Sequence, residues 1–119
     1  MGLKRIFKQV RDRYVVAQVE ALKIPLFAEE AAVRYRMVFF GRVQKVGFRL
    51  AVCELAKRLE LTGFCANRED GSVVAELQGT QERIDFLLRF LNSRKRIRIT
   101  DMVCEKKTVL SEEKEFRKF

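Results

Sequence analysis

Apolar residues near the start of the chain recur every three or four positions, which is the spacing of one face of an α-helix. This stripe consists of Leu3, Ile6, Phe7, Val10 and Tyr14, and basic residues fill most of the positions between them. The pattern predicts a basic amphipathic helix to about Ala21, ended by Pro25 and followed by a linker to Ala32. We expect the stripe to pack on the rest of the protein. The alternative is a helix that lies on an anionic membrane, although the stripe is short and lacks Trp.

The rest of the chain shows strand and helix patterns in turn. Runs of β-branched and aromatic residues predict strands, and apolar residues three and four apart predict helices. We expect Thr62 and Gly63 to end the first helix of this region. Asp70 and Gly71 predict a hairpin turn, and Thr80 is a suitable N-cap for the next helix. The predicted elements are a strand at 33–40, a helix at 48–59, strands at 63–67 and 72–78, a helix from 80, a strand at 97–104 and a short edge strand at 116–119.

The predicted order of strand, helix, strand, strand, helix, strand is the split βαβ pattern of the ferredoxin-like sandwich. This α+β fold has one antiparallel sheet with two helices on one face, and the N-terminal helix would be additional. We therefore divide the chain into a helix and linker at 1–32 and a folded domain at 33–119. In this topology the first two strands run parallel, because a right-handed crossover joins them. The loop Gly41–Arg49 after the first strand should then lie near Asn67, which ends the second.

Composition narrows the class of protein. Of the 119 residues 48% are hydrophobic and 34% are charged, as in a globular domain large enough to bury a core. No apolar run approaches the roughly 20 residues of a membrane span, and the start of the chain lacks the apolar core of a signal peptide, so we expect a cytoplasmic protein. The absence of histidine removes the commonest general base and most transition-metal sites. The net charge of +9 favours anionic partners, which include phosphates, nucleic acid, acidic proteins and anionic lipid.

The three cysteines, Cys53, Cys65 and Cys104, are widely spaced and stand in apolar patterns. We expect buried free thiols in a reducing compartment rather than disulfides. Neither Cys53 nor Cys65 has an obvious activating cation beside it in the sequence, so a thiol enzyme is disfavoured.

The stretch GRVQKVGFR, residues 41–49, joins the first predicted strand of the domain to a helix. A glycine-containing loop at this point presents backbone N–H groups at the positive end of the helix dipole, and such an arrangement binds anions. Arg49 stands in the first helical turn, where a cation is unfavourable unless an anion is bound beside it. Its guanidinium has the planar fork that matches two phosphate oxygens. The glycine spacing fits neither a P-loop nor a dinucleotide fingerprint.

Together, the stretches GRVQKVGFR, GFCANREDGSV and ELQG resemble the acylphosphatase family, whose signature runs Gly-Arg-Val-Gln-Gly-Val-x-Phe-Arg, and the likeness covers roughly Val33 to Phe119. Members of that family have the ferredoxin-like fold and hydrolyse the carboxyl-phosphate bond of acyl phosphates to a carboxylate and inorganic phosphate, without metal or cofactor. The resemblance implies that Arg49 and loop amides bind the phosphoryl group and that Asn67 orients the attacking water. The loop amides are those of Gln44, Lys45, Val46, Gly47 and Phe48.

This chain departs from the family pattern in three places. Lys45 stands where the signature has its second glycine, and a positive φ at that position would cost roughly 1 kcal/mol of strain. It also adds a cation beside the expected phosphate site. The stretch NSRKRIRIT replaces a Gly-Pro often found after the domain's second helix, and the N-terminal helix is additional to the family's usual length.

Two other functions use the same fold. In the first, the loop holds phosphate or an acidic partner without catalysis, which the basic runs Lys4–Arg13 and Arg94–Arg98 would favour. In the second, the protein binds RNA by stacking bases on aromatic residues of the first and third strands. The predicted third strand, SVVAELQ, has no aromatic residue, so we expect no specific nucleic-acid recognition. We expect a monomer, and self-association through the N-terminal helix is the alternative.

Overall fold

The computed structural model describes residues 2–119 as a succession of helices and strands. The helices are α1 (Leu3–Glu20), α2 (Phe48–Arg58) and α3 (Gln81–Asn92). The strands are β1 (Val33–Arg42), β2 (Thr62–Asn67), β3 (Val73–Gly79), β4 (Arg98–Lys107) and β5 (Phe116–Lys118). These are the elements that the periodicity predicts, with small shifts at their ends.

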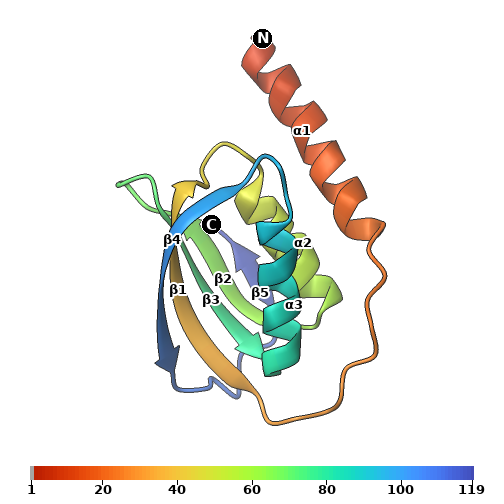
Figure 1. Ribbon diagram of the computed structural model, residues 1–119, viewed down its shortest axis with the longest axis vertical. Coiled ribbons are helices and arrows are strands. Elements are labelled where there is room, and N and C mark those ends of the chain that lie inside the picture. The colour runs from red at the N-terminus through yellow and green to blue at the C-terminus, as the bar shows by residue number, and fades with distance from the viewer. Residues whose placement is uncertain (1) are drawn as a thin grey trace.

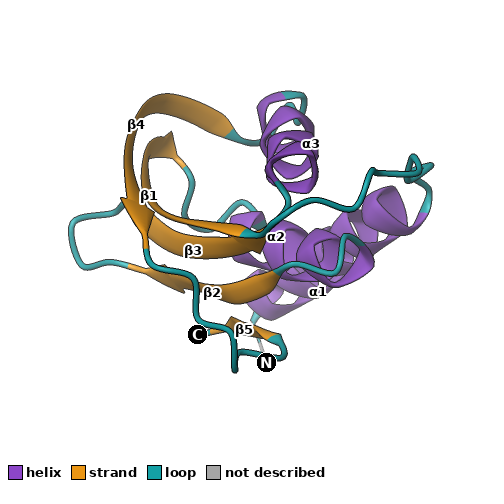
Figure 2. Cartoon of the chain, turned by 90° about the horizontal axis from the view of Figure 1, so that it is seen from below, coloured by secondary structure: helices purple, strands orange, loops and turns teal. Residues whose placement is uncertain are grey.

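The strands form one sheet in the order β4-β1-β3-β2-β5, with α2 and α3 on one face and α1 beside α2 (Figures 1 and 2). β3 pairs antiparallel with both β1 and β2, so β1 and β2 run parallel to each other with β3 between them. This is the ferredoxin-like α+β sandwich that the sequence predicts. The sheet is mixed and not wholly antiparallel, because β5 pairs parallel with β2.

The hydrophobic core lies between the sheet and the helices α2 and α3, and it fixes the start of α2. Phe39 of β1 and Phe48, the first residue of α2, are both buried, and their ring centroids lie 5.1 Å apart. Leu55 of α2 and Leu87 of α3 are buried in the same cluster. Because burial of large apolar side chains is the main stabilising contribution to folding, the loop between β1 and α2 is held at both ends by the core.

The helix α2 ends in a different way from the one predicted. Glu60 adopts a left-handed backbone with a φ of 57°. The amide of Leu61 donates to the carbonyl of Ala56 at 2.8 Å, which is the hydrogen bond of a Schellman motif, a helix end that usually has glycine at its left-handed position. Thr62 and Gly63, which we expected to end α2, belong instead to β2.

The helix α1 spans the residues predicted for it, but its apolar stripe is largely exposed to solvent. The stripe residues expose 49% to 69% of their surface: Leu3, Ile6, Phe7, Val10 and Tyr14. The helix packs instead through Val15 and Val19, which are buried, and Val15 lies about 100° around the helix axis from Tyr14. The expectation that the stripe would be buried is therefore wrong. Among residues 2–119, no helix combines the length and the apolar character of a membrane-spanning segment.

The C-terminal half of α1 is fixed against α2 and the loop that precedes it. Arg58 of α2 donates from Nη1 to the carbonyls of Val19 (2.6 Å) in the last turn of α1 and of Leu22 (2.9 Å) just beyond it. Val15 meets the loop, since a Cβ built on Gly47 would lie 2.8 Å from Val15 Cγ2. The N-terminal half of α1 extends away from these contacts, as Figure 1 shows.

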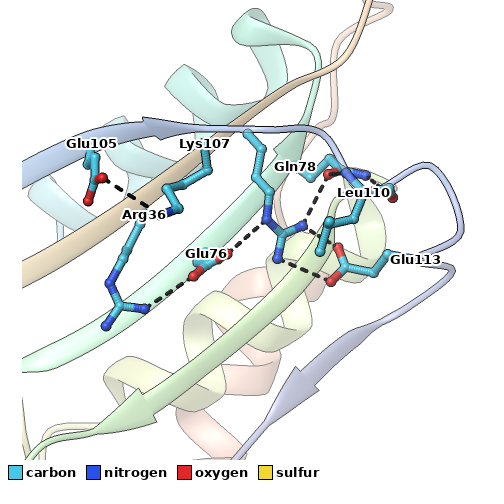
Figure 3. Close-up of polar contacts among 8 residues, drawn as sticks. Arg36, Glu76, Gln78, Glu105, Lys107, Leu110 and Glu113 are labelled. Carbon is cyan, nitrogen blue, oxygen red and sulfur yellow. Dashed lines mark hydrogen bonds and ion pairs between the residues drawn. The ribbon is translucent and has the colours of Figure 1, made fainter.

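A buried ion-pair network ties the segment between β4 and β5 to the sheet. Arg34 of β1 is only 2% exposed and donates to Glu76 (2.8 Å) and Gln78 (3.1 Å) of β3. It also donates to both carboxylate oxygens of Glu113, at 2.7 and 3.2 Å. Gln78 exchanges two hydrogen bonds with the backbone of Leu110 (Figure 3). The segment that leads into β5 is thus held in place by side chains of β1 and β3.

Candidate active site

The loop between β1 and α2 presents its amides at the start of a helix. Lys45 and Gly47 both have positive φ, 62° and 82°, so Lys45 adopts the left-handed conformation that a glycine would adopt without strain. Gly47 is the N-cap of α2, and no side chain within residues 2–119 caps the helix there. The first amides of α2 are therefore available to a ligand, at the positive end of the helix dipole.

Gln44 joins this loop to the hairpin between β2 and β3. Its Nε2 donates to the carbonyls of Arg68 (2.8 Å) and Ser72 (2.9 Å). The hairpin turns where predicted, with Gly71 at a φ of 91°, and Asp70 accepts hydrogen bonds from Ser72 that lower the pKa of its carboxyl. The side chain of Gln44 thus positions the loop, and its backbone amide is the group that remains for a ligand.

The other residues predicted to bind substrate divide between core and solvent. Phe48 is buried, and Val46 is partly buried and packs against the core. Their side chains hold the loop from beneath, so a ligand would meet their amides and not their side chains. Lys45 is exposed to solvent.

Arg49 lies in the first turn of α2 and is held by the end of the chain. Its Nη1 donates to the backbone oxygen of Phe119 at 2.6 Å. The amide of Phe119 donates in turn to the carbonyl of Cys65 in β2 at 2.9 Å. Because an arginine has five N–H donors, this bond orients the guanidinium and leaves further donors for an anion.

Asn67 ends β2 opposite Val73 of β3, and it is exposed. It lines a cavity of about 660 Å³ whose wall also includes Lys45, Gly47 and Arg49. The loop after β1 and the end of β2 therefore meet at one edge of the sheet, as the topology predicts. Arg49 and Asn67, which are distant in sequence, share one cavity.

Other residues in the wall of the cavity come from parts of the chain that could not be predicted from the sequence to lie near this loop. They include Lys4, Phe7, Lys8, Arg11 and Asp12 of α1, together with Arg96 and Lys118. Basic residues outnumber acidic ones 25 to 16 in the whole chain, but the described wall of the cavity has seven cationic side chains against one carboxylate. The basic runs in the sequence indicate an anionic partner, whereas their position over this loop depends on how α1 packs.

The thiols are poor candidates for a nucleophile. Burial raises the pKa of the Cys65 thiol to about 12, although the charge of Arg49 opposes the shift. Burial also raises the pKa of Cys53, and both residues are buried as predicted. Cys104 is exposed, so the expectation that it would be buried is wrong: it lies in β4, an edge strand that pairs with β1 alone. Among residues 2–119, no three His, Cys, Asp or Glu side chains converge as a metal site would require.

The family model described as acylphosphatase matches residues 35–118. The chain belongs to the acylphosphatase family. An acylphosphatase from Geobacillus kaustophilus is 35% identical to it over 85 residues, which are 71% of this chain and 90% of that protein. An acylphosphatase from Burkholderia vietnamiensis is 41% identical over 80 residues, which are 66% of this chain and 79% of that protein.

Solved structures of acylphosphatases have the same fold. That from Bacillus subtilis superposes with a TM-score of 0.66 at 28% identity, covering 73% of this chain and 98% of its own. That from Coxiella burnetii gives a TM-score of 0.65 at 25% identity, covering 74% and 93% of the two chains. The match to the acylphosphatase family model begins at residue 35, so α1 and the linker lie outside the matched region.

Proposed function

We propose that this chain hydrolyses the carboxyl-phosphate bond of acyl phosphates to a carboxylate and inorganic phosphate. The observation that carries the proposal is a single cavity, in a chain of the acylphosphatase family, that holds both the loop with Arg49 and the side chain of Asn67. Relatives at 35% and 41% identity bear the name of that activity, which further supports the proposal.

In this proposal, Arg49 and the amides from Gln44 to Phe48 bind the phosphoryl group. The guanidinium and the N–H groups at the start of α2 stabilise the negative charge that spreads over the phosphoryl oxygens in the transition state. The bond from Arg49 to the backbone oxygen of Phe119 supports this role, because it holds the guanidinium in one orientation before substrate arrives.

Asn67 orients the water that attacks phosphorus in line with the leaving group. A side-chain amide can accept a hydrogen bond from water and donate another to a phosphoryl oxygen. The carboxylate leaves with the electron pair of the P–O bond and is a stable anion at neutral pH. Little general acid catalysis is required, so the absence of histidine is no obstacle. Catalysis then depends on charge stabilisation and on the placement of water.

The test is hydrolysis of benzoyl phosphate in the presence of a metal chelator, with inorganic phosphate added as a competitive inhibitor. The Arg49→Ala variant should lose nearly all turnover while its circular dichroism and melting temperature stay close to those of the unmodified protein. The Asn67→Ala variant should lose turnover but keep most of its affinity for phosphate. Arg89→Ala, at an exposed position of α3, is the matched control. Turnover by Arg49→Ala equal to that of the control would end this assignment.

A non-catalytic module that binds phosphate or an acidic partner is the second candidate, and the cation-rich wall of the cavity favours it. Such a module would bind inorganic phosphate in a calorimetric titration and would not hydrolyse benzoyl phosphate. Phosphate binding without turnover by the unmodified protein would therefore replace the first proposal by this one.

We also propose that the protein acts without a metal ion, as a cytoplasmic monomer, with residues 33–119 as the catalytic domain and residues 1–32 as an added segment. The free thiols support a reducing compartment. The basic residues along the exposed stripe of α1 support a monomer, because they would repel one another in a pair of these helices. Size-exclusion chromatography at low and high salt tests whether the protein is a monomer. Binding of DNA that weakens steeply as the salt concentration rises would reveal a nonspecific electrostatic interaction with nucleic acid.

A further inference from the structure

The helix α1 forms part of the candidate site's wall, although it lies outside the region that the family shares. Its C-terminal half is anchored, since Val19 is buried and its carbonyl accepts a hydrogen bond from Arg58. From its N-terminal half, Lys4, Lys8 and Arg11 line the cavity. The wall is thus a feature of this chain, held in place by contacts away from the cavity.

The cationic side chains of the cavity exceed what one phosphoryl group requires. If Arg49 and the loop amides hold a phosphoryl dianion, further cations remain in the wall: Lys4, Lys8, Arg11, Lys45, Arg96 and Lys118. The carboxylate of Asp12, the one acid among the described wall residues, is already paired with Arg11 at 3.0 Å and with Lys8 at 3.8 Å. Like charges gathered around a cleft repel one another, and they raise the local concentration of anions.

The cations of α1 are sorted by the face on which they lie. At about 100° per residue, Lys4, Lys8 and Arg11 fall within about 60° of one another, and all three line the cavity. Arg5 and Arg13 lie roughly 90° and 170° away from that group. Both are exposed, and neither lines the cavity. Arg5 and Arg13 can therefore serve as control positions on the same helix, because they carry charge but do not face the cavity.

We propose that Lys4 and Lys8 form a second anion subsite, which recognises a negative charge on the acyl part of the substrate. The preferred substrates are then acyl phosphates whose acyl group carries a carboxylate or a further phosphate. This inference rests on the proposed function. Arg11 has a different role, because its guanidinium is bonded to Asp12 and its side chain packs near Gly47. The side chain of Lys8 is 64% exposed and its contact with Asp12 is a long surface ion pair of 3.8 Å, which contributes little, so Lys8 can exchange that partner for a ligand.

The test compares 4-carboxybenzoyl phosphate with benzoyl phosphate at constant ionic strength. The two substrates differ by one carboxylate, which is too far from the phosphoryl group to attack it within the molecule. The unmodified protein should show a higher kcat/KM for the carboxylated substrate. In the Lys4→Ala/Lys8→Ala variant this preference should fall roughly tenfold, as expected for the loss of two partly exposed ion pairs. The Arg5→Ala/Arg13→Ala control removes the same charge from the same helix and should keep the preference.

Each outcome decides between the explanations. An equal fall in both double variants would overturn the subsite, because it would show a general effect of net charge. A preference that survives in Lys4→Ala/Lys8→Ala would also overturn it. Lys8→Arg should retain the preference, and Lys8→Gln alone should reduce it, which keeps the test open if the double variant is less stable. Turnover of both substrates without preference defeats only the subsite, whereas turnover of neither by the unmodified protein defeats the proposed function as well.

Discussion

Replacement of Arg34 by methionine should lower the free energy of unfolding by about 3 kcal/mol. Methionine fills much of the space of the arginine's aliphatic part but leaves Glu113 without its hydrogen bonds at 2.7 and 3.2 Å. Glu76 keeps a second partner, Arg36 at 3.1 Å, so one carboxylate and not two is left uncompensated. Removal of one partner of a buried pair costs about 3–5 kcal/mol, and the 21% exposure of the Glu113 side chain argues for the lower end.

The pH dependence of stability provides an independent measure of the same contact. Burial is the largest single influence and would raise the pKa of Glu113, but the hydrogen bonds from Arg34 and Thr62, together with the charges of Arg34 and Arg117, outweigh it and lower the pKa. A carboxyl whose pKa is lower in the folded state stabilises the protein above its unfolded pKa of about 4.3. That contribution is lost as the pH falls through the folded pKa. The unmodified protein should therefore lose more stability than Arg34→Met between pH 6 and pH 3.

The assay is urea unfolding of both proteins across this pH range, with Glu113→Gln and the double variant completing a double-mutant cycle. The double variant should recover part of the loss, because it no longer contains an unpaired carboxylate in a partly buried position. A loss below about 1 kcal/mol for Arg34→Met, with an unchanged denaturant dependence, would refute the reasoning. It would mean that the network behaves as an ordinary surface ion pair.

Two further predictions concern the backbone at Lys45 and the reactivity of the cysteines. Lys45→Gly should be more stable than Lys45→Ala by about 1 kcal/mol in urea unfolding, because only glycine adopts the φ of 62° without strain, and the reverse order would contradict the assigned backbone. A thiol reagent at pH 8 should label Cys104 rapidly in the native protein and should reach Cys53 and Cys65 only after unfolding, as followed by mass spectrometry. Rapid native labelling of Cys65 would contradict its burial and its raised pKa.

The meeting of Arg49 and Asn67 could be predicted because chain topology requires it. A right-handed crossover makes β1 and β2 parallel, and the C-terminal ends of parallel strands lie at one edge of the sheet. The positive φ at Lys45 could be anticipated from the resemblance to the family. The family has glycine at that position, which suggests a backbone conformation that glycine adopts without strain. Both expectations depend on rules of covalent geometry and handedness that hold whatever packs nearby.

The end of α2 could not be read correctly, because two uses of glycine look alike in a sequence. Gly63 follows the helical pattern and resembles a helix stop, but a Cβ at that position would collide with the carbonyl oxygen of Glu76 on β3. The glycine is required by the close approach of two strands. The left-handed residue that ends α2 is Glu60, whose type gives no signal of that conformation.

The orientation in which α1 packs could not be predicted from the sequence, for a related reason. Periodicity reveals that a helix has an apolar stripe, but it does not show which surface covers that stripe. Val15 and Val19 lie off the stripe and are the residues that pack, so the helix is rotated relative to the expectation and presents Lys4 and Lys8 to the cavity. The cationic wall is therefore a product of tertiary packing. The charge of the chain indicates it, but only the fold locates it.

The segment from β4 to the end of the chain connects the stability of the fold to the candidate site. Arg34 holds Glu113 before β5, and Arg49 holds Phe119 after it. Between them, β5 pairs with β2 and Phe116 is buried. A loss of about 3 kcal/mol leaves most molecules of a typical domain folded, since total stabilities are about 5–15 kcal/mol. If turnover by Arg34→Met falls by more than its fraction of unfolded molecules, we attribute the extra loss to a less well oriented Arg49. If the folded variant keeps full turnover, β5 and its pairing with β2 are sufficient to hold Phe119.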